Sequence, residues 1–344
     1  MKPISILASG MVTSVGLDSL SACAAIRCAI DNFSETRFMD QGGEWIIGAQ
    51  VPLDQPWRGL PKLVHMAVPA IRECLAHAAS VRADQIPLLL GVAEKERPGR
   101  LEGLDDQLFS EIQTKLGVQF HHRSGVIAKG RIAGAVAMGA ARDLIYNERV
   151  PFCLIAGVDT YLIAATLAAY EQKSRLLTSQ NSNGFIPGEA AAAILVGPAN
   201  ASPAPDLVCY GIGSGHEKAT IDSEEPLRGD GLVQALQSAI DEAGCAINDL
   251  DYRITDSNGE LYWFKEATLG LDRILRKRKE LFEIWHPADC IGETGSAVVP
   301  CTLGVALQAA RRNYAFGRGP LCHFGSDSGD RMALVLNQNK GGKN

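Results

Sequence analysis

A pattern that occurs twice at one offset restricts the folds open to this chain more than any other feature of its sequence. Residues 140–153 read Ala-Ala-Arg, six further residues, then Arg-x-Pro-x-Cys, and residues 309–322 repeat that arrangement. The same offset aligns residues 70–73 (AIRE) with residues 239–242 (AIDE). Two matches at a single offset predict that the chain is built from two related halves.

We place the two halves at roughly 1–200 and 206–338 and expect them to form one compact, pseudo-duplicated unit. The segment 197–205 (GPANASPAP) is the expected linker, because its Pro, Gly and Ser content disfavours both helix and strand. The glycine-rich segment 211–216 (GIGSGH) lacks the Lys-Ser/Thr pair of a phosphate-binding loop. We expect it to form a tight turn at the end of the first strand of the second half.

Apolar runs and helical patterns alternate along the chain. Residues 152–158 and 190–196 are continuous apolar runs, as expected of strands buried on both faces. Residues 60–79 and 133–146 have helical spacing, with small residues gathered on one face. This alternation predicts two α/β units packed against each other.

The composition excludes several classes of partner. With 46% hydrophobic and 21% charged residues and a net charge of -6, the chain offers no electrostatic reason to bind nucleic acid or an anionic membrane. No apolar stretch reaches the roughly 18 residues of a membrane span. Nine scattered cysteines without a CxxC pair fit free thiols in a reducing cytoplasm, so we expect a cytoplasmic protein. No motif calls for a cofactor or a metal ion.

Two polar segments have alternative interpretations. The basic run 273–279 (RILRKRK) is expected to be the solvated face of a helix, and the alternative is a docking patch for an acidic partner. Residues 121–124 (HHRS) have no third ligand at a definable spacing, so we expect a surface turn and not a metal site.

Four segments carry a resemblance to the β-ketoacyl synthases of the thiolase superfamily. Residues 183–195 (NGFIPGEAAAAIL) resemble that family's DGFVxGEGAGALVL motif, and within them Glu189 is expected to be a buried structural acid. Residues 156–159 (AGVD) resemble its AGGxD turn, residues 290–295 (CIGETG) its MTGHTxGAAG segment, and residues 10–16 (GMVTSVG) its first loop. Order and spacing agree over essentially the whole chain. The resemblance implies an α/β thiolase fold, internally duplicated, with five layers in the order α/β/α/β/α.

The catalytic residues of that family are not present at the matching positions. Its members use a Cys at the start of a buried helix, where the helix dipole lowers the thiol pKa, and two His, or His and Asn, that support decarboxylation and stabilise the oxyanion. The resemblance places the nucleophile position at Arg131 and the two His positions at Asp256 and Glu293. No cysteine lies between Cys74 and Cys153, so a small error of register cannot restore the nucleophile. The sequence therefore predicts a degenerate triad with no catalytic residue.

The three replacements suggest a hypothesis about the former site. We expect Arg131 to fill it and to pair with one or both of the carboxylates, which turns a reaction centre into a structural clamp. Lys129 is the candidate if the register is wrong by two residues. The family's lysine before the second His corresponds to Ala288, and its glycine-rich FGFGGTN loop corresponds to residues 324–330 (FGSDSGD).

The preferred functional prediction is a catalytically inactive binding or accessory subunit. The resemblance implies a homodimer or a heterodimer, formed through the strand predicted at 152–158. The partner is then another copy, a ketosynthase paired as with a chain length factor, or an effector or adaptor protein, since ketosynthase-like proteins without the triad resemble accessory proteins of type VI secretion effector loading. An acyl carrier protein is a further partner that the resemblance allows. The alternative is a β-ketoacyl synthase or acyltransferase that uses Asp256 or Glu293 as base on acyl thioesters, which an open apolar tunnel reaching Arg131 would favour.

Overall fold

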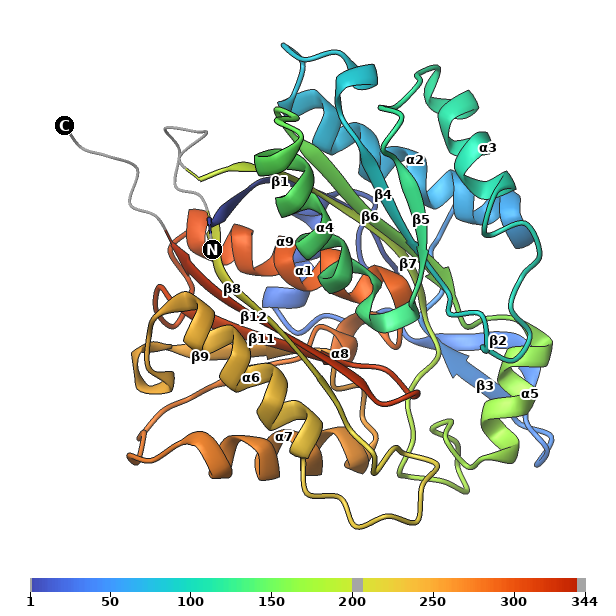
Figure 1. Ribbon diagram of the computed structural model, residues 1–344. Helices are drawn as coiled ribbons and strands as arrows, with labels where there is room; N and C mark the ends of the chain where they lie inside the picture. Colours follow the sequence, from blue (N-terminus) through green and yellow to red (C-terminus); the bar gives the residue numbers. More distant parts are fainter. Residues whose placement is uncertain (1, 200–206, 339–344) are drawn as a thin grey trace.

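The computed structural model describes residues 2–199 and 207–338, in which ten strands form one mixed β-sheet (Figure 1). The strand order is β10-β9-β11-β12-β8-β1-β7-β6-β4-β5. The pairing is the same in both halves. In the N-terminal half β1 is antiparallel to β7 and β7 to β6, while β6, β4 and β5 are parallel. In the C-terminal half β8 is antiparallel to β12 and β12 to β11, while β11, β9 and β10 are parallel. The strands of the N-terminal half are β1 (Ile4–Val12), β7 (Glu189–Pro198), β6 (Cys153–Thr160), β4 (Leu88–Val92) and β5 (Gly125–Ala128), and those of the C-terminal half are β8 (Leu207–His216), β12 (Asp330–Gln338), β11 (Pro320–Gly325), β9 (Tyr252–Thr255) and β10 (Ile284–Trp285).

The helices divide the molecule into five layers, as the family resemblance implies. Helices of the N-terminal half lie outside its strands, the central helices lie between the two halves of the sheet, and helices of the C-terminal half lie outside its strands (Figure 1). These layers contain α2 (Gly59–His77) and α3 (Gln107–Leu116), then α4 (Ala133–Asn147) and α9 (Val298–Arg311), then α6 (Asp230–Ala243) and α7 (Leu261–Ile274). The remaining helices are α1 (Ser19–Arg27), α5 (Ala164–Gln172) and the short α8 (Ala288–Ile291).

Separate apolar cores fill the spaces between these layers. The central core contains Met138 of α4 and Leu303 of α9, packed with strand residues from both halves. The two outer cores lie under α2 and under α6. Both α4 and α9 contact both halves of the sheet. Helix α9 is buried along nearly its whole length, whereas seven residues of α4 are buried, five of them Ala or Gly.

Within the described residues, the two halves of the sheet join through three residue pairs, at the start of the first strand of each half. Ile4, Ser5 and Ile6 of β1 pair antiparallel with residues 207–209 of β8. The central helices then lie between the two halves of the sheet (Figure 1). The predicted linker lies partly outside the described residues, which end at residue 199 and resume at 207, while Gly197 and Pro198 belong to β7. The division at 200–206 therefore stays a prediction.

Strand β8 corrects the expectation of a tight turn at residues 211–216, which form its C-terminal part. Its glycines lie on the face that packs against α6. A Cβ on Gly211 or Gly213 would lie 2.0 Å from a backbone oxygen of that helix, and one on Gly215 would lie 2.1 Å away. The glycines alternate because every second residue of a strand faces the same side, and here that side must accept a helix backbone at close range.

Strand β6 corrects a second expectation. The predicted dimerisation strand 152–158 falls in β6, which pairs with β4 on one side and β7 on the other, and all eight of its residues are buried. An interior strand has no free edge for another chain. The strands at the ends of the described sheet are β5 and β10.

The surface segments agree partly with prediction. Residues 121–124 form a turn in which His122 and Arg123 are exposed. Helix α7 ends at Ile274, so the basic residues 276–279 lie in a loop and not on a helix. All nine cysteines are free, and all but Cys28 and Cys245 are buried. None of the helices in the described part of the chain is long and apolar enough to cross a bilayer.

Candidate functional site

Arg131 lies where the sequence places it, at the beginning of central helix α4. Strand β5 ends at Ala128, a single 3₁₀ turn spans Gly130–Ile132, and α4 begins at Ala133. Gly130 has φ = 51°, a left-handed conformation that favours glycine and lets the chain turn sharply from strand into helix. The side chain of Arg131 is only 4% exposed.

The structure brings Arg131 together with both carboxylates. Its Nη2 lies 2.9 Å from Oδ2 of Asp256 and donates a hydrogen bond of 2.8 Å to the backbone oxygen of the same residue. Its Nε lies 3.4 Å from Oε2 of Glu293. The guanidinium carbon lies 4.1 Å from the ring centroid of Trp263, within the range of a cation–π contact. The pairing proposed from the sequence is thus formed with both acids, while Lys129 is exposed and pairs elsewhere.

Backbone and side-chain donors fix the two carboxylates in place. Asp256 accepts a hydrogen bond of 2.9 Å from the backbone N–H of Gly325, in the loop that corresponds to the family's glycine-rich segment. Glu293 accepts bonds of 2.9 Å from the N–H of Gly295 and 2.7 Å from Nδ2 of Asn258. Each acid therefore has partners besides the arginine, and all of them are buried.

Burial and charge act in opposite directions on these groups. Burial raises the pKa of Asp256 and of Glu293, and Arg131 opposes that rise without cancelling it. For Arg131, burial alone would lower the pKa, but the two carboxylates outweigh burial and raise it. The guanidinium is therefore a permanent cation. It has no lone pair for nucleophilic attack, and it cannot act as a general acid or base near neutral pH.

Three further buried arginines extend this arrangement into a network. Each one pairs with at least one acid, and Asn258 links two of the clusters by donating to Glu260 as well as to Glu293. The pairs are Arg97 with Asp159 (3.0 Å) and Glu94 (2.7 Å), Arg175 with Glu260 (2.6 Å) and Asp327 (2.6 Å), and Arg331 with Glu266 (2.9 Å).

Sequence reasoning missed these three arginines. Apart from Glu94, their partners lie 62 to 152 residues away along the chain, so no local spacing signals the pairs. For Arg97 and Arg175 the available signal was an acid inside a recognised segment, Asp159 in the AGVD turn and Asp327 in the loop 324–330, whereas Glu266, the partner of Arg331, lies in no such segment. A carboxylate buried by a motif requires a cation, which then has to be sought elsewhere in the chain.

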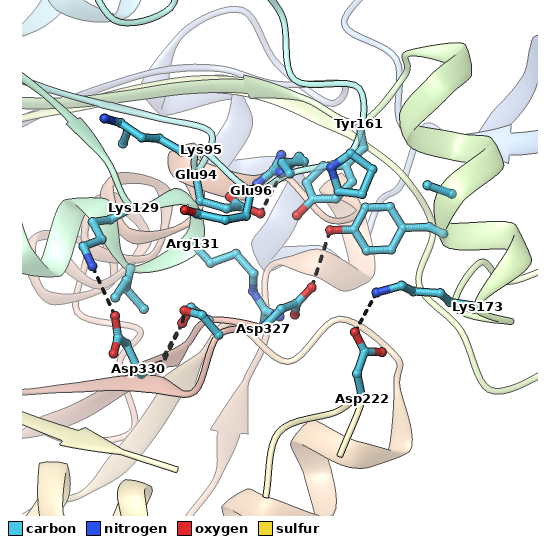
Figure 2. A pocket seen from close by; sticks show the side chains of 18 residues that line it. Glu94, Lys95, Glu96, Lys129, Arg131, Tyr161, Lys173, Asp222, Asp327 and Asp330 are labelled. Carbon is cyan, nitrogen blue, oxygen red and sulfur yellow. Dashed lines mark hydrogen bonds and ion pairs between the residues drawn. The ribbon is translucent and has the colours of Figure 1, made fainter. Parts of the chain in front are cut away.

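Arg131 is one of the residues that line a partly open cavity of about 460 Å³. Figure 2 shows the side chain of Arg131 among the others of this lining. Two exposed ion pairs connect the halves across the cavity, Lys129 with Asp330 at 3.3 Å and Lys173 with Asp222 at 2.6 Å. Its lining is mostly charged, in contrast to the apolar tunnel that a long acyl chain requires. The charged residues are Glu94, Lys95, Glu96, Arg97, Lys129, Arg131, Lys173, Asp222, Asp327 and Asp330.

Glu189 is the structural acid that the sequence predicts. It is buried and accepts hydrogen bonds of 2.9 Å from the N–H of Val51 and from Oγ1 of Thr160. It also forms an ion pair with Lys62. Ala288, which corresponds to the family's lysine, is buried at the start of α8 and brings no charge. Among the described residues, no group of three or more His, Cys, Asp or Glu side chains is placed to hold a metal ion.

Known structures share this architecture over the whole chain. No protein-family model matches the sequence, and a sequence search of curated proteins finds no significant match. A chain from a type II polyketide synthase complex, an acyl-carrier protein with its ketosynthase bound to the hexaketide, is 12% identical with a TM-score of 0.81 and covers 98% of this chain and 99% of its own.

Two further similar structures are ketosynthase pairs. The ishigamide ketosynthase/chain length factor is 15% identical with a TM-score of 0.78, covering 98% of this chain and 99% of that one. A ketosynthase in complex with its chain length factor from Xenorhabdus doucetiae is 15% identical with a TM-score of 0.74, covering 98% of both. The chain therefore has the thiolase-like fold of ketosynthases and chain length factors.

Proposed function

We propose that this chain is a ketosynthase-fold protein that acts by binding another protein and does not form an acyl-enzyme. The observation that supports the proposal is the placement of Arg131 at the start of α4, paired with Asp256 at 2.9 Å and Glu293 at 3.4 Å. The family resemblance assigns these positions to a nucleophile and two bases. A cation held by two acids has none of that reactivity.

The cysteines give no replacement nucleophile near the site. Burial raises the pKa of Cys74, Cys153 and Cys301, so these thiols stay protonated and inert. Cys28 and Cys245 are the accessible ones. Neither lines the cavity that Arg131 borders.

The partner we propose is a ketosynthase, with which this chain would pair as a chain length factor does. The other partners that fit a binding role are a second copy of the chain, an acyl carrier protein, and an effector or adaptor protein of a type VI secretion system. Two similar structures are ketosynthase–chain length factor pairs. With β6 inside the sheet, we place the pairing edge at β5, whose four residues are all half-buried. Since β5 leads directly into the turn that carries Arg131, a partner at this edge would lie next to the ion-paired cluster.

The second candidate is an acyltransferase or condensing enzyme with Asp256 or Glu293 as base. Two observations favour it: the cavity reaches Arg131, and Nη1 of that arginine has no hydrogen-bond acceptor among the described residues. A thioester carbonyl could accept from it. The charged lining of the cavity and the existing partners of both acids count against this candidate.

Intact mass after incubation with acyl-CoA and acyl-carrier-protein thioesters tests the proposal. The expected result is an unchanged mass. Because exposed thiols can be acylated without catalysis, the matched control is a variant with Cys28→Ser and Cys245→Ser. A gain of one acyl group that persists in this variant would reveal a nucleophile inside the protein and overturn the proposal.

A further inference from the structure

The hairpin of β2 (Ser34–Met39) and β3 (Trp45–Gly48) exposes three large apolar side chains on its outer face, beside Glu35 and Arg37. The inner face packs Ile46 against the aromatic cluster around Phe185. The outer face carries Met39, Trp45 (47% exposed) and Ile47, and Leu177 lies beside them at the edge of a shallow groove. A solvated face of an antiparallel sheet normally carries polar residues, and an apolar patch that contains an exposed Trp is typical of a protein interaction site.

Carboxylates border this face. Glu35, Asp40 and Glu44 line the same groove as Trp45 and Ile47. Arg37 is the single basic residue in the segment 34–48, and its guanidinium lies over the ring of Phe38 at 5.0 Å. The hairpin therefore fits a protein segment in which a bulky apolar side chain is flanked by Lys or Arg.

The loop between α7 and β10 combines four basic residues, 276–279 (RKRK), with the apolar Leu281, and a single acid, Glu280, lies between them. Phe282 anchors the loop, because Lys279 lies 4.6 Å and Arg253 lies 5.1 Å from its ring, and Arg253 also donates a 3.1 Å hydrogen bond to the Phe282 backbone oxygen. Residues 276–278 (RKR) are exposed, and Leu281 is 71% exposed, more than any other large apolar residue of the described chain.

We propose that the 276–281 loop of one copy docks on the β2–β3 hairpin face of a second copy, with Leu281 against Trp45 and the basic residues against the acidic border. In Figure 1 the hairpin lies at one side of the molecule, beside α5, and the loop follows the far end of α7 at the opposite side, so a single chain cannot make this contact with itself. The two surfaces are different, so the interface is head-to-tail and leaves one free hairpin and one free loop in every open assembly. It is independent of any pairing at β5.

Sedimentation equilibrium at low and high salt tests this interface. The wild-type chain is expected to gain mass with protein concentration at about 0.05 M salt and to lose most of that gain at about 0.5 M, because exposed charges are screened. The hairpin variant carries Glu35→Lys and Glu44→Lys, and the loop variant carries Lys277→Glu and Arg278→Glu. Each is expected to weaken the association constant by roughly ten- to thirtyfold.

A chain with all four substitutions has the signs exchanged on both surfaces and is expected to recover association to within roughly threefold of wild type. Misfolding cannot produce such a recovery. Weakening by the hairpin variant alone, with the loop variant unchanged, would mean that the hairpin serves a foreign partner, and the proposal would be wrong. It would also be overturned by a mass that does not depend on salt, or by failure of the exchanged chain to recover.

Discussion

Replacing Arg131 with Met should destabilise the protein far more than a similar change two residues away. Arg131→Met removes the cation between Asp256 and Glu293 and leaves two buried carboxylates without it. Breaking a buried ion pair in this way costs about 3–5 kcal/mol. With a urea slope of about 3 kcal/mol per molar, the unfolding midpoint falls by roughly 1–1.7 M. Lys129→Met is the matched control, since that lysine forms an exposed pair worth at most about 1 kcal/mol.

The same reasoning predicts that removing the whole cluster costs little. In Arg131→Met/Asp256→Asn/Glu293→Gln the acids become neutral amides of the same shape, which still accept the hydrogen bonds from Gly325 and Gly295. Neutral replacement of a complete buried ion-pair cluster is typically neutral or stabilising by about 1–4 kcal/mol. Urea unfolding followed by tryptophan fluorescence compares the variants. A triple variant as unstable as Arg131→Met, or an Arg131→Met no weaker than Lys129→Met, would refute the clamp.

The loss of unfolding free energy in Arg131→Met should also depend on pH. Burial already raises the pKa of Asp256 and Glu293, and losing the opposing cation raises both further. The folded variant then holds protons that the unfolded chain releases above about pH 4, so its stability falls as the pH rises. The difference from wild type should be smaller at about pH 5 than at about pH 7.5. A deficit that does not change with pH would mean that these carboxylates are not the groups left unpaired.

Two further predictions concern packing and titration. Gly213→Ala should destabilise the protein by about 1–3 kcal/mol or more, because the new Cβ would lie 2.0 Å from the backbone oxygen of Ala235. A Cβ at Gly139 meets nothing within 4 Å, so Gly139→Ala should stabilise α4 by up to about 1 kcal/mol. Thermal unfolding of both variants checks this, and equal losses of stability would contradict it. The Asp289 carboxylate, 2.7 Å from Nδ1 of His286, accepts its hydrogen bond and holds the pKa of His286 above its usual value. His286 therefore contributes stability below the unfolded-state pKa of about 6.5, and this stability is lost as the pH rises through the folded-state pKa. An NMR titration should show a lower pKa of His286 in Asp289→Asn, and an unchanged pKa would contradict the assignment.

Local patterns and resemblance were sufficient to predict the fold and the three positions that meet at the site. The repeat and the apolar runs predicted two α/β halves, and the motif around Glu189 predicted the family of folds. The two predictions that were wrong depended on tertiary contacts. The glycines of residues 211–216 have the composition of a turn, and only the close approach of α6 makes them a strand. The apolar run 152–158 could not reveal whether its strand lies inside the sheet or at its edge.

The buried arginine network was out of reach for the same reason. Apart from Glu94, the acidic side chains that pair with Arg97, Arg175 and Arg331 lie at least 62 residues away in sequence. A pattern of apolar and polar residues predicts which positions are buried, but a single arginine in a sequence is normally expected to be exposed. Acids within buried motifs were the indirect sign that compensating cations had to exist.

Decarboxylation of a malonyl thioester tests the loss of chemistry without requiring a nucleophile. In the family that the chain resembles, the two His positions support this step, and here they correspond to Asp256 and Glu293. Malonyl-CoA and malonyl-carrier-protein incubated with the protein should yield acetyl thioester no faster than the buffer blank. Decarboxylation above the blank that disappears in Asp256→Asn or Glu293→Gln would show that the site has retained catalysis, and the binding role proposed here would be wrong.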